Sequence, residues 1–431
     1  MKKVISLVLL ATMTVSVLAG CGSSSGTTGA KKNVTLTVLT NRTDIVGTDL
    51  KKFGDDYKAK TGVTIKWEAS ADYEGDTKVR LNSKNYGDVL LIPAAVAVSD
   101  LSQYFVPLGK TTDAKIQNYN YNDLKATKNS DGSFTTYGLS YGMGTSGVVY
   151  NKATLKSAGV DTFPTTLTGL YDAFAKLKAK GVVPVAINFK DKWPLSAYDD
   201  LATVESGNGS WYNTIYKETA PFSADKPNGK ALEVLYKIVS GGFCEKDLTT
   251  TSWESSKTDL GTGKVGMMFL GTWSIPQMQG AATNKDDIAY APTPTDDTGK
   301  FKSVTSADWS LAVSKNSANI QQAKDFLFAF VDSDYGVNNG FLPIQKDRQP
   351  TNPVLKSFLA TGVTLLYSKP GPVGDEGDKK DKISNKATID FYGDIYLQNI
   401  AIAAKSSRAD FDKAVAGLNT KWAKAKTDLN Y

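Results

Sequence analysis

The sequence predicts an α/β protein organised as two domains. Strand-like and helix-like segments alternate along the chain, and the first sixty residues of this pattern hold three strands and two helices. About 400 residues follow an apolar leader, which is more than one hydrophobic core usually serves. A hydrophobic content of 41% and an aromatic content of 10% are sufficient for two such cores.

The first elements predict a parallel sheet with covering helices. Residues 33–40 are rich in β-branched residues, as strands are, and residues 49–60 place Leu50, Phe53 and Tyr57 on one helical face, which ends before Gly62. Parallel strands need crossover connections, so a βαβαβ order favours a parallel sheet. The elements predicted here are strand 33–40, helix 49–60, strand 63–67, helix 73–84 and strand 88–92.

The remaining elements continue the alternation, with more helix towards the C-terminus. Glycine and proline mark the boundaries of these elements; for example, a helix is predicted to begin at Pro164 and to end before Gly181. In order, the sequence predicts extended chain over 137–151, helix 164–180, strand 182–187, helices 211–217, 229–239 and 252–260, strand 265–270, strand 309–313, and helices 320–331, 387–396 and 410–429.

The N-terminus has the layout of an export signal. Lys2 and Lys3 precede an apolar run that is too short to span a bilayer comfortably, and Leu-Ala-Gly stands directly before Cys21. This arrangement resembles the lipobox of bacterial lipoproteins, in which the cysteine is lipidated and becomes the first mature residue; the alternative is an ordinary secretory signal with an incidental cysteine. We expect a signal peptide over 1–20, a flexible tether over 21–32, and an exported protein lipid-anchored to the outer face of the bacterial cytoplasmic membrane.

The net charge and the cysteine content limit the kinds of partner and covalent cross-link that the chain can have. The formal charge of +6 falls to +4 without Lys2 and Lys3, and its carriers are dispersed, so no nucleic-acid partner is expected. With Cys21 in the anchor, Cys244 has no partner for an intramolecular disulfide and is expected to be a small core residue.

The chain contains no histidine, which removes several catalytic and metal-binding classes. Residues 138–142 match the G-x-S-x-G nucleophile elbow, but no imidazole is present to take the serine proton. Residues 142–147 match G-x-G-x-x-G, but they lead into a strand-like run and not into a helix. Zinc sites built from Cys and His are excluded as well.

Four adjacent aspartate pairs raise the question of a calcium site. None has EF-hand spacing, and loop or helix-cap positions explain them as well, so no cofactor is expected. The pairs are Asp55-Asp56, Asp199-Asp200, Asp286-Asp287 and Asp296-Asp297.

Taken in order, several stretches resemble the extracellular solute-binding proteins of bacterial ABC transporters, family 1, in the cluster that carries sugars and oligosaccharides. The resemblance covers almost the whole mature chain, with Gly87 where the family usually has proline and Leu167 where it often has tryptophan. The matching stretches are 34–38, 62–66, 87–89, 131–139, 149–152, 163–167, 175–181, 263–273, 323–327 and 331–333.

The resemblance implies a two-lobe periplasmic-binding-protein-like fold with interlobe hinge strands and a ligand cleft. One lobe is expected at 33–140 and 305–350, the other at 141–304 and 351–431, with crossings near 141–142, 303–307 and 343. It also implies a monomer that closes around a carbohydrate ligand and delivers it to the transmembrane permease subunits, without being an enzyme.

Candidate ligand-binding residues follow from the chemistry of sugars. A pyranose has an apolar C–H face and a rim of hydroxyls, so its site needs aromatic rings beside planar polar groups. Trp273 follows the strand 265–270 at its carboxyl end, where α/β proteins bind ligands. The other candidates, each with packing or a solvent-exposed loop as the alternative, are Asp308, Trp309, Trp193, Trp211, Arg42, Asp44, Tyr73 and Tyr141.

Two other classes of function stay open at this point. A binding protein for a non-sugar ligand, such as a peptide, polyamine or metal, would have the same fold. A secreted glycan-active enzyme would need two carboxyl groups facing one sugar, and the sequence is rich in acids.

Overall fold

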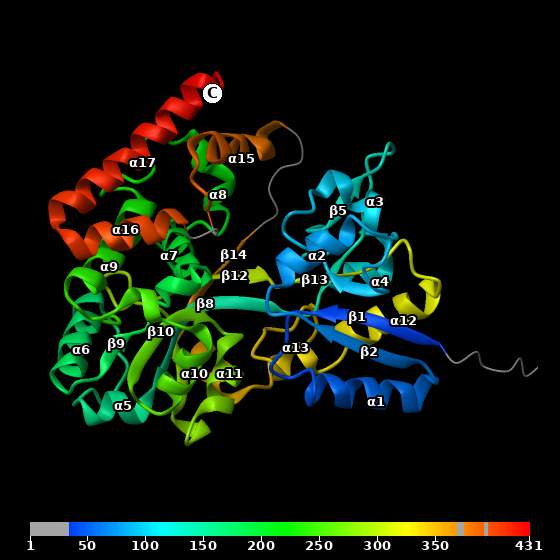
Figure 1. Cartoon of the computed structure of the whole chain (residues 1–431), viewed down its shortest axis with the longest axis horizontal. Helices are drawn as coiled ribbons and strands as arrows, with labels where there is room; N and C mark the ends of the chain where they lie inside the picture. Colours follow the sequence, from blue (N-terminus) through cyan, green and yellow to red (C-terminus); the bar gives the residue numbers. More distant parts are fainter. Residues whose placement is uncertain (1–33, 369–374, 392–394) are drawn as a thin grey trace, which may run out of the picture.

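The computed structural model describes residues 34–368, 375–391 and 395–431. These residues form two α/β lobes that lie side by side, with β8 and β12 running through the middle of the molecule (Figure 1). The predicted signal peptide, Cys21 and the predicted tether lie outside the described residues.

The first lobe is built on a five-stranded sheet of order β2-β1-β3-β13-β7. Its first three strands are parallel, and the helices between them confirm the predicted βαβαβ unit. The elements are β1 (Thr35–Thr40), α1 (Asp49–Thr61), β2 (Thr64–Ala69), α2 (Tyr73–Leu81), β3 (Val89–Leu91), β7 (Leu139–Ser140) and β13 (Ser310–Val313), and the last two run antiparallel to their neighbours.

Helix α12 (Ile320–Val331) covers this sheet with an aromatic face. Phe326 and Phe330 both contact the ring of Trp67 on β2 at centroid distances of 5.8 Å. The indole of Trp67 therefore belongs to the core of the first lobe. A small antiparallel sheet and short helices complete the lobe: η1 (Val98–Asp100), α3 (Leu101–Tyr104), β4 (Gly109–Lys110), α4 (Ala114–Gln117), β5 (Ala126–Lys128), β6 (Phe134–Thr136) and α13 (Tyr335–Asn338).

The second lobe is built on a six-stranded sheet of order β14-β12-β8-β10-β9, with β11 also paired to β8. Its strands are β8 (Met143–Asn151), β9 (Val183–Val185), β10 (Val265–Gly271), β11 (Ile288–Ala291), β12 (Lys302–Ala307) and β14 (Thr364–Tyr367). Its helices are α5 (Lys152–Ser157), α6 (Leu167–Ala179), η2 (Phe189–Asp191), η3 (Trp193–Ser196), α7 (Ala197–Ser206), α8 (Trp211–Thr214), η4 (Ile215–Lys217), α9 (Pro227–Ser240), η5 (Leu248–Thr250), α10 (Trp253–Gly261), α11 (Ser274–Ala281), η6 (Lys285–Asp287), α14 (Pro353–Leu359), α15 (Asp375–Ala387), α16 (Ile395–Ser406) and α17 (Arg408–Asp428).

The chain passes between the lobes in adjacent segments that are bonded to one another. Met143 pairs with Ala307 of β12 and forms a bridge with Leu342, and the N–H of Asp308 donates to the carbonyl of Gly142 at 3.0 Å. Residues 305–307, which we expected in the first lobe, continue β12 because they pair with β8 of the second sheet. The connection to the first sheet therefore falls after Ala307.

The structure agrees with the prediction for one glycine-rich motif and differs from it for one helix. The glycine-rich run 142–147 leads into strand β8, and the next helix starts only at Lys152, which confirms that a strand and not a helix follows the glycines. The helix predicted over 387–396 is wrong. Helix α15 ends at Ala387, Thr388 takes a left-handed φ of 54°, and a new helix starts at Ile395.

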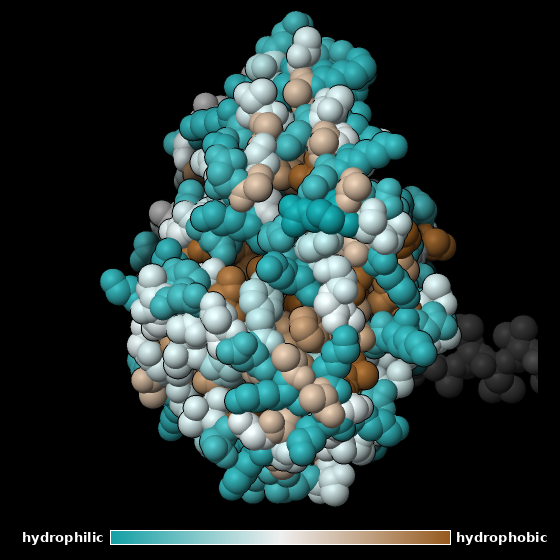
Figure 2. All heavy atoms as spheres, turned by 90° about the vertical axis from the view of Figure 1, so that its left-hand side faces the viewer, coloured by the Kyte–Doolittle hydropathy of each residue, from teal (hydrophilic) through white to brown (hydrophobic). Residues whose placement is uncertain are grey.

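The surface is mainly polar or neutral on the side drawn in Figure 2, with hydrophobic residues in small separate spots. The large apolar side chains exposed in the described part of the chain are spread over several elements, such as Val79 on α2 and Ile402 on α16. None of the helices within the described ranges is long and apolar enough to span a membrane.

Candidate ligand-binding cleft

A cleft of about 830 Å³ lies between the two lobes. The first lobe contributes the loop after β1 and the start of α2, and the second lobe contributes η3 and the starts of α10 and α11. The segments that cross between the lobes, including Gly144–Ser146 and Ala307–Trp309, also line it. A ligand in this cleft would therefore touch both lobes and the connection between them.

Three tryptophans form an aromatic wall on the second lobe. Trp193, Trp253 and Trp273 come from three different elements, and their ring centroids lie 4.9, 5.6 and 5.8 Å apart in pairs. All three side chains are partly exposed and line the cleft. Among the described residues their indole N–H groups have no hydrogen-bond acceptor. The wall therefore offers apolar ring surface together with free donors.

Local structure holds this wall in place. The Asp191 carboxylate accepts a hydrogen bond from the N–H of Trp253, the first residue of α10. Trp273 stands directly before α11, and the preceding N–H of Thr272 donates to the carbonyl of Thr145 on β8 at 2.9 Å. Two of the three tryptophans are thus fixed through backbone contacts with other segments.

The first lobe supplies an opposing aromatic pair. The rings of Trp309 and Tyr73 meet edge to face at 5.5 Å, and the Tyr73 hydroxyl donates to the carbonyl of Leu91 at 2.9 Å. Trp309 is partly exposed to the cleft, whereas Tyr73 is buried behind it. Trp309 is therefore the ring that a ligand would meet on this side.

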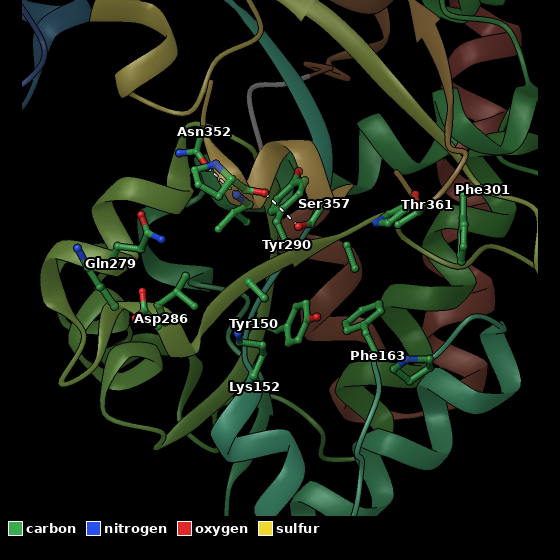
Figure 3. Close-up of a pocket in the computed structure, with 18 of the residues that line it drawn as sticks. Tyr150, Lys152, Phe163, Gln279, Asp286, Tyr290, Phe301, Asn352, Ser357 and Thr361 are labelled. Carbon is green, nitrogen blue, oxygen red and sulfur yellow. Dashed lines mark hydrogen bonds between the residues drawn. The ribbon is translucent and has the colours of Figure 1, made fainter. Parts of the chain in front are cut away.

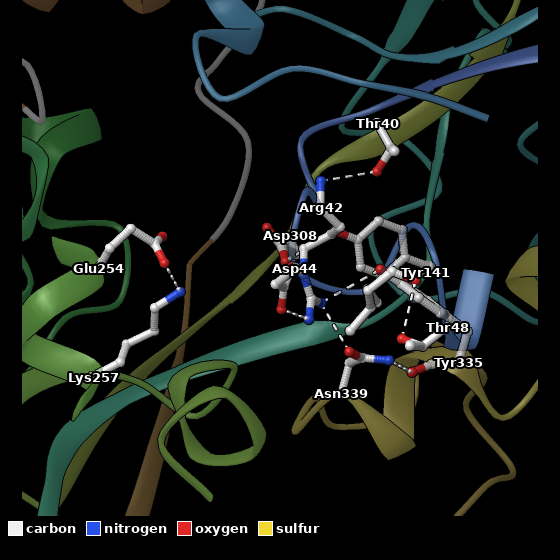
Figure 4. Close-up of polar contacts among 11 residues, drawn as sticks. Thr40, Arg42, Asp44, Thr48, Tyr141, Glu254, Lys257, Asp308, Tyr335 and Asn339 are labelled. Atoms are coloured by element: carbon white, nitrogen blue, oxygen red, sulfur yellow. Dashed lines mark hydrogen bonds and ion pairs between the residues drawn. The ribbon is translucent and has the colours of Figure 1, made fainter. Parts of the chain in front are cut away.

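Arg42 organises a polar cluster beside the lobe connection (Figure 4). Its guanidinium donates to both carboxylate oxygens of Asp44 at 2.8 Å and to Asn339 Oδ1 at 2.8 Å, and it reaches the Tyr335 hydroxyl at 3.5 Å. Burial disfavours both charges, yet the Arg42–Asp44 hydrogen bonds raise the pKa of Arg42 and lower the pKa of Asp44. Asp44 is thereby held as a charged acceptor at the cleft surface.

Asp308 is a second carboxylate in the floor of the cleft. Its oxygens accept hydrogen bonds from the N–H of Trp309 at 2.8 Å and from the Tyr141 hydroxyl at 3.3 Å. Burial raises the pKa of Asp308 to about 6, although these donors and the charge of Arg42 stabilise the carboxylate. Tyr141 is buried against Tyr335 and Phe341, so Asp308 is the more exposed member of this pair at the cleft.

Asp200 on α7 lines the cleft from the second lobe. Burial and the neighbouring charge of Asp199 raise the pKa of Asp200 to about 7. Carboxylates predominate along the cleft, and the cations that line it are Arg42 and Lys257, each already paired with an acid: Asp44 and Glu254. No cluster of three potential metal ligands occurs in the described ranges.

The predicted site residues thus meet in one place, with one correction. Trp273, Trp193, Trp309, Asp308, Arg42, Asp44, Tyr73 and Tyr141 all line the cleft. Trp211 does not: it is 9% exposed, and its Nε1 donates to Asn228 Oδ1 in the core between α8 and α9. Its place in the sequence near Asp199 and Asp200 was misleading because α8 packs its tryptophan inward.

Sequence reasoning missed Trp253, Asp191 and Lys257. Trp253 is the first residue of α10 and the second of the helix predicted over 252–260, and a tryptophan at the start of a helix is a signal that could have been used. Asp191 acquires its role only through a contact with a residue 62 positions away in the sequence.

Cys244, the cysteine expected to be a small core residue, is free and half-buried, and burial raises the pKa of its thiol to about 12.

The fold and the cleft are those of a ligand-binding protein with two α/β lobes. The chain belongs to the bacterial extracellular solute-binding protein family, whose model matches residues 41–334. This family membership confirms the resemblance noted in the sequence.

Two solved structures from Bifidobacterium animalis subsp. lactis are similar to this chain. One is a binding protein of an ABC transporter in complex with mannobiose, and it is 29% identical, with a TM-score of 0.81 over 92% of this chain and 95% of that chain. The other is a manno-oligosaccharide specific solute binding protein in complex with mannotriose, with the same identity, score and coverage.

A curated relative gives a weaker match. It is an uncharacterized ABC transporter extracellular-binding protein from Pyrococcus horikoshii, 26% identical over 221 residues, or 49% of this chain. The matched region spans about half of that relative, 47% of its length.

Proposed function

We propose that this protein is the substrate-binding protein of an ABC importer and captures a neutral oligosaccharide in the cleft between its lobes. The observation that carries this proposal is the aromatic lining of both cleft walls, with Trp193, Trp253 and Trp273 on one side and Trp309 on the other. Aromatic rings pack on the apolar faces of sugar rings, and the free indole donors suit their hydroxyl rims.

The charges of the cleft favour a neutral sugar. Asp44, Asp200 and Asp308 present acceptors to the cleft, while Arg42 and Lys257 are already engaged by acids. A uronic acid would add an anion to this set without a free cation to pair with it. The mannobiose and mannotriose complexes of the similar structures support the same class of ligand.

Tryptophan fluorescence tests the proposal directly. Titration with mannobiose, mannotriose and other neutral oligosaccharides is expected to give a saturable change in emission, because four partly exposed tryptophans line the cleft. An oligosaccharide that carries a uronic acid is the matched control and should bind more weakly. Saturation by a peptide or polyamine and by no sugar would refute the proposed ligand class, and sustained release of reducing ends would reveal an enzyme.

Delivery of the ligand requires an anchor and a partner. We propose that Cys21 carries the lipid, that the protein works as a monomer, and that the closed ligand-bound form docks on the permease subunits. In cells that express a Cys21→Ser variant, the protein is expected in the soluble exported fraction with unchanged sugar affinity. Unchanged membrane retention of that variant would place the anchor elsewhere.

A further inference from the structure

A second cavity, of about 720 Å³, lies wholly in the second lobe (Figure 3). Strand β8 runs from one cavity to the other: Gly144–Ser146 line the cleft, whereas Tyr150 lines the second cavity. Five residues of strand separate Thr145 from Tyr150, which is about 17 Å at the usual rise. No residue lines both cavities, so this is a separate site.

The cavity has an aromatic wall. The rings of Tyr150 and Phe163 lie 4.6 Å apart, and both side chains are half-buried. Tyr290 adds a third ring, and the single proton of its hydroxyl is shared between the carbonyl oxygens of Thr145 and Leu270, at 2.6 and 2.7 Å. Because these bonds hold the Tyr290 ring in place, this part of the wall is formed before any ligand arrives.

Hydrogen-bonding groups without partners surround this wall. In the part of the chain that the structure describes, Lys152, Gln279, Lys285 and Asp286 make no side-chain hydrogen bond or ion pair, and the Tyr150 hydroxyl is likewise unpaired. Figure 3 places Lys152 beside Tyr150, with Gln279 and Asp286 at one end of the cavity. The lysines are cationic donors, the Asp286 carboxylate is an acceptor, and the Gln279 amide both donates and accepts hydrogen bonds.

We infer that this cavity is a second carbohydrate site that takes one or two sugar rings. Hydroxyl groups both donate and accept hydrogen bonds, so a sugar can satisfy the lysines, the carboxylate and the amide together. An anionic ligand would face Asp286, and a cationic ligand would face Lys152 and Lys285. The volume lies within the range of small-molecule pockets. The site does not depend on which ligand the cleft binds.

Calorimetry on matched variants tests this site. Mannobiose, mannotriose and raffinose are titrated into the wild-type protein, into Trp273→Ala, which weakens the cleft, and into Lys152→Ala/Asp286→Ala, which changes exposed residues of the second cavity. Lys156→Ala, another exposed lysine of α5 outside the cavity, is the control.

The expected result is that at least one of these sugars binds the wild-type protein with two equivalents. Trp273→Ala should retain the second event, which should produce heat without a tryptophan signal because no tryptophan lines that cavity. In Lys152→Ala/Asp286→Ala the second event should weaken at least tenfold while cleft binding persists, and Lys156→Ala should behave as the wild type. A single equivalent for every sugar, or a second event that survives in the double variant, would overturn the proposal.

Discussion

At the scale of single residues, tryptophans in this protein divide into rings that face the cleft and rings that build the core. Trp273 is partly exposed and touches two other cleft-lining indoles, whereas Trp211 is buried with its N–H bonded to Asn228. The two residues have the same chemistry in different surroundings. They form a matched pair for separating ligand binding from stability.

Trp273→Ala is expected to weaken sugar binding by about 1–3 kcal/mol, or roughly 5- to 150-fold, because it removes a ring that packs on the ligand. Trp211→Ala should instead cost about 3–5 kcal/mol of unfolding free energy, as buried tryptophans do, with unchanged affinity in the folded fraction. Fluorescence titration and thermal melts of both variants measure the two effects. If Trp273→Ala melted much earlier and bound sugar normally, its ring would belong to the core.

Asp200 predicts a dependence of stability on pH. Its pKa is raised to about 7 in the folded protein, so the folded state holds a proton that the unfolded chain releases near pH 4. The contribution of Asp200 to unfolding free energy therefore falls as pH rises from about 4 to 7 and stays low above that range.

Asp200→Asn removes this penalty and is expected to be more stable than the wild type at pH 8, by on the order of 1–3 kcal/mol, with little difference near pH 4. Urea unfolding across this pH range measures the difference. Asp172→Asn, at an exposed position of α6, is the matched control because it removes the same type of carboxyl group from the surface and leaves Asp200 in place. A gain from Asp200→Asn that did not vary with pH would contradict this interpretation.

At the scale of elements, the turn between β10 and α11 sets the orientation of the second-lobe wall. A Cβ atom on Gly271 would lie 2.5 Å from Nε1 and 2.7 Å from Cδ1 of Trp273. Glycine at this position therefore allows the indole to fold back over the end of β10. The cleft depends on this close approach as well as on the tryptophan itself.

Gly271→Ala is expected to displace the Trp273 ring and to weaken sugar binding about 3- to 30-fold, while leaving all four cleft tryptophans in the chain. Gly280→Ala is the control, since a Cβ there meets nothing within 4 Å. It lies inside α11 and should add about 0.5–1 kcal/mol of stability without changing affinity. Equal affinities for the two variants would show that the ring position does not depend on Gly271.

The sequence predicted local elements better than distant contacts. Helix 320–331 and the βαβαβ unit were predicted because their apolar spacing is a property of neighbouring residues. The break at Thr388 was missed because a left-handed φ at a threonine has no strong local signal. Trp273 and Trp309 both line the cleft, and the signal that made them candidate site residues is local, since each stands next to a strand of a sheet.

The rest of the cleft depends on contacts between distant segments. Trp253 is held in the wall by Asp191, and Arg42 is held by Asn339, which directly follows α13 and lies almost 300 residues later in the chain. Such contacts are set by how the lobes fold and are not visible in a local pattern. The same reason explains why Trp211 was wrongly predicted to line the cleft, since its burial depends on the packing of α8 against α9.

At the scale of the whole molecule, the cleft walls belong to different lobes that are joined by adjacent crossing segments near Met143, Ala307 and Leu342. A sugar that contacts Trp273 and Trp309 together would draw the walls towards each other, and rotation about these segments would absorb the movement. Capture of a sugar between the lobes is therefore expected to close them.

Small-angle X-ray scattering with and without a saturating neutral oligosaccharide measures this closure. The radius of gyration of the wild-type protein is expected to fall on saturation, and that of Trp273→Ala should stay unchanged at a sugar concentration well below its weakened dissociation constant. An identical scattering curve for the free protein and for protein that fluorescence shows to be saturated would contradict capture by closure between the lobes.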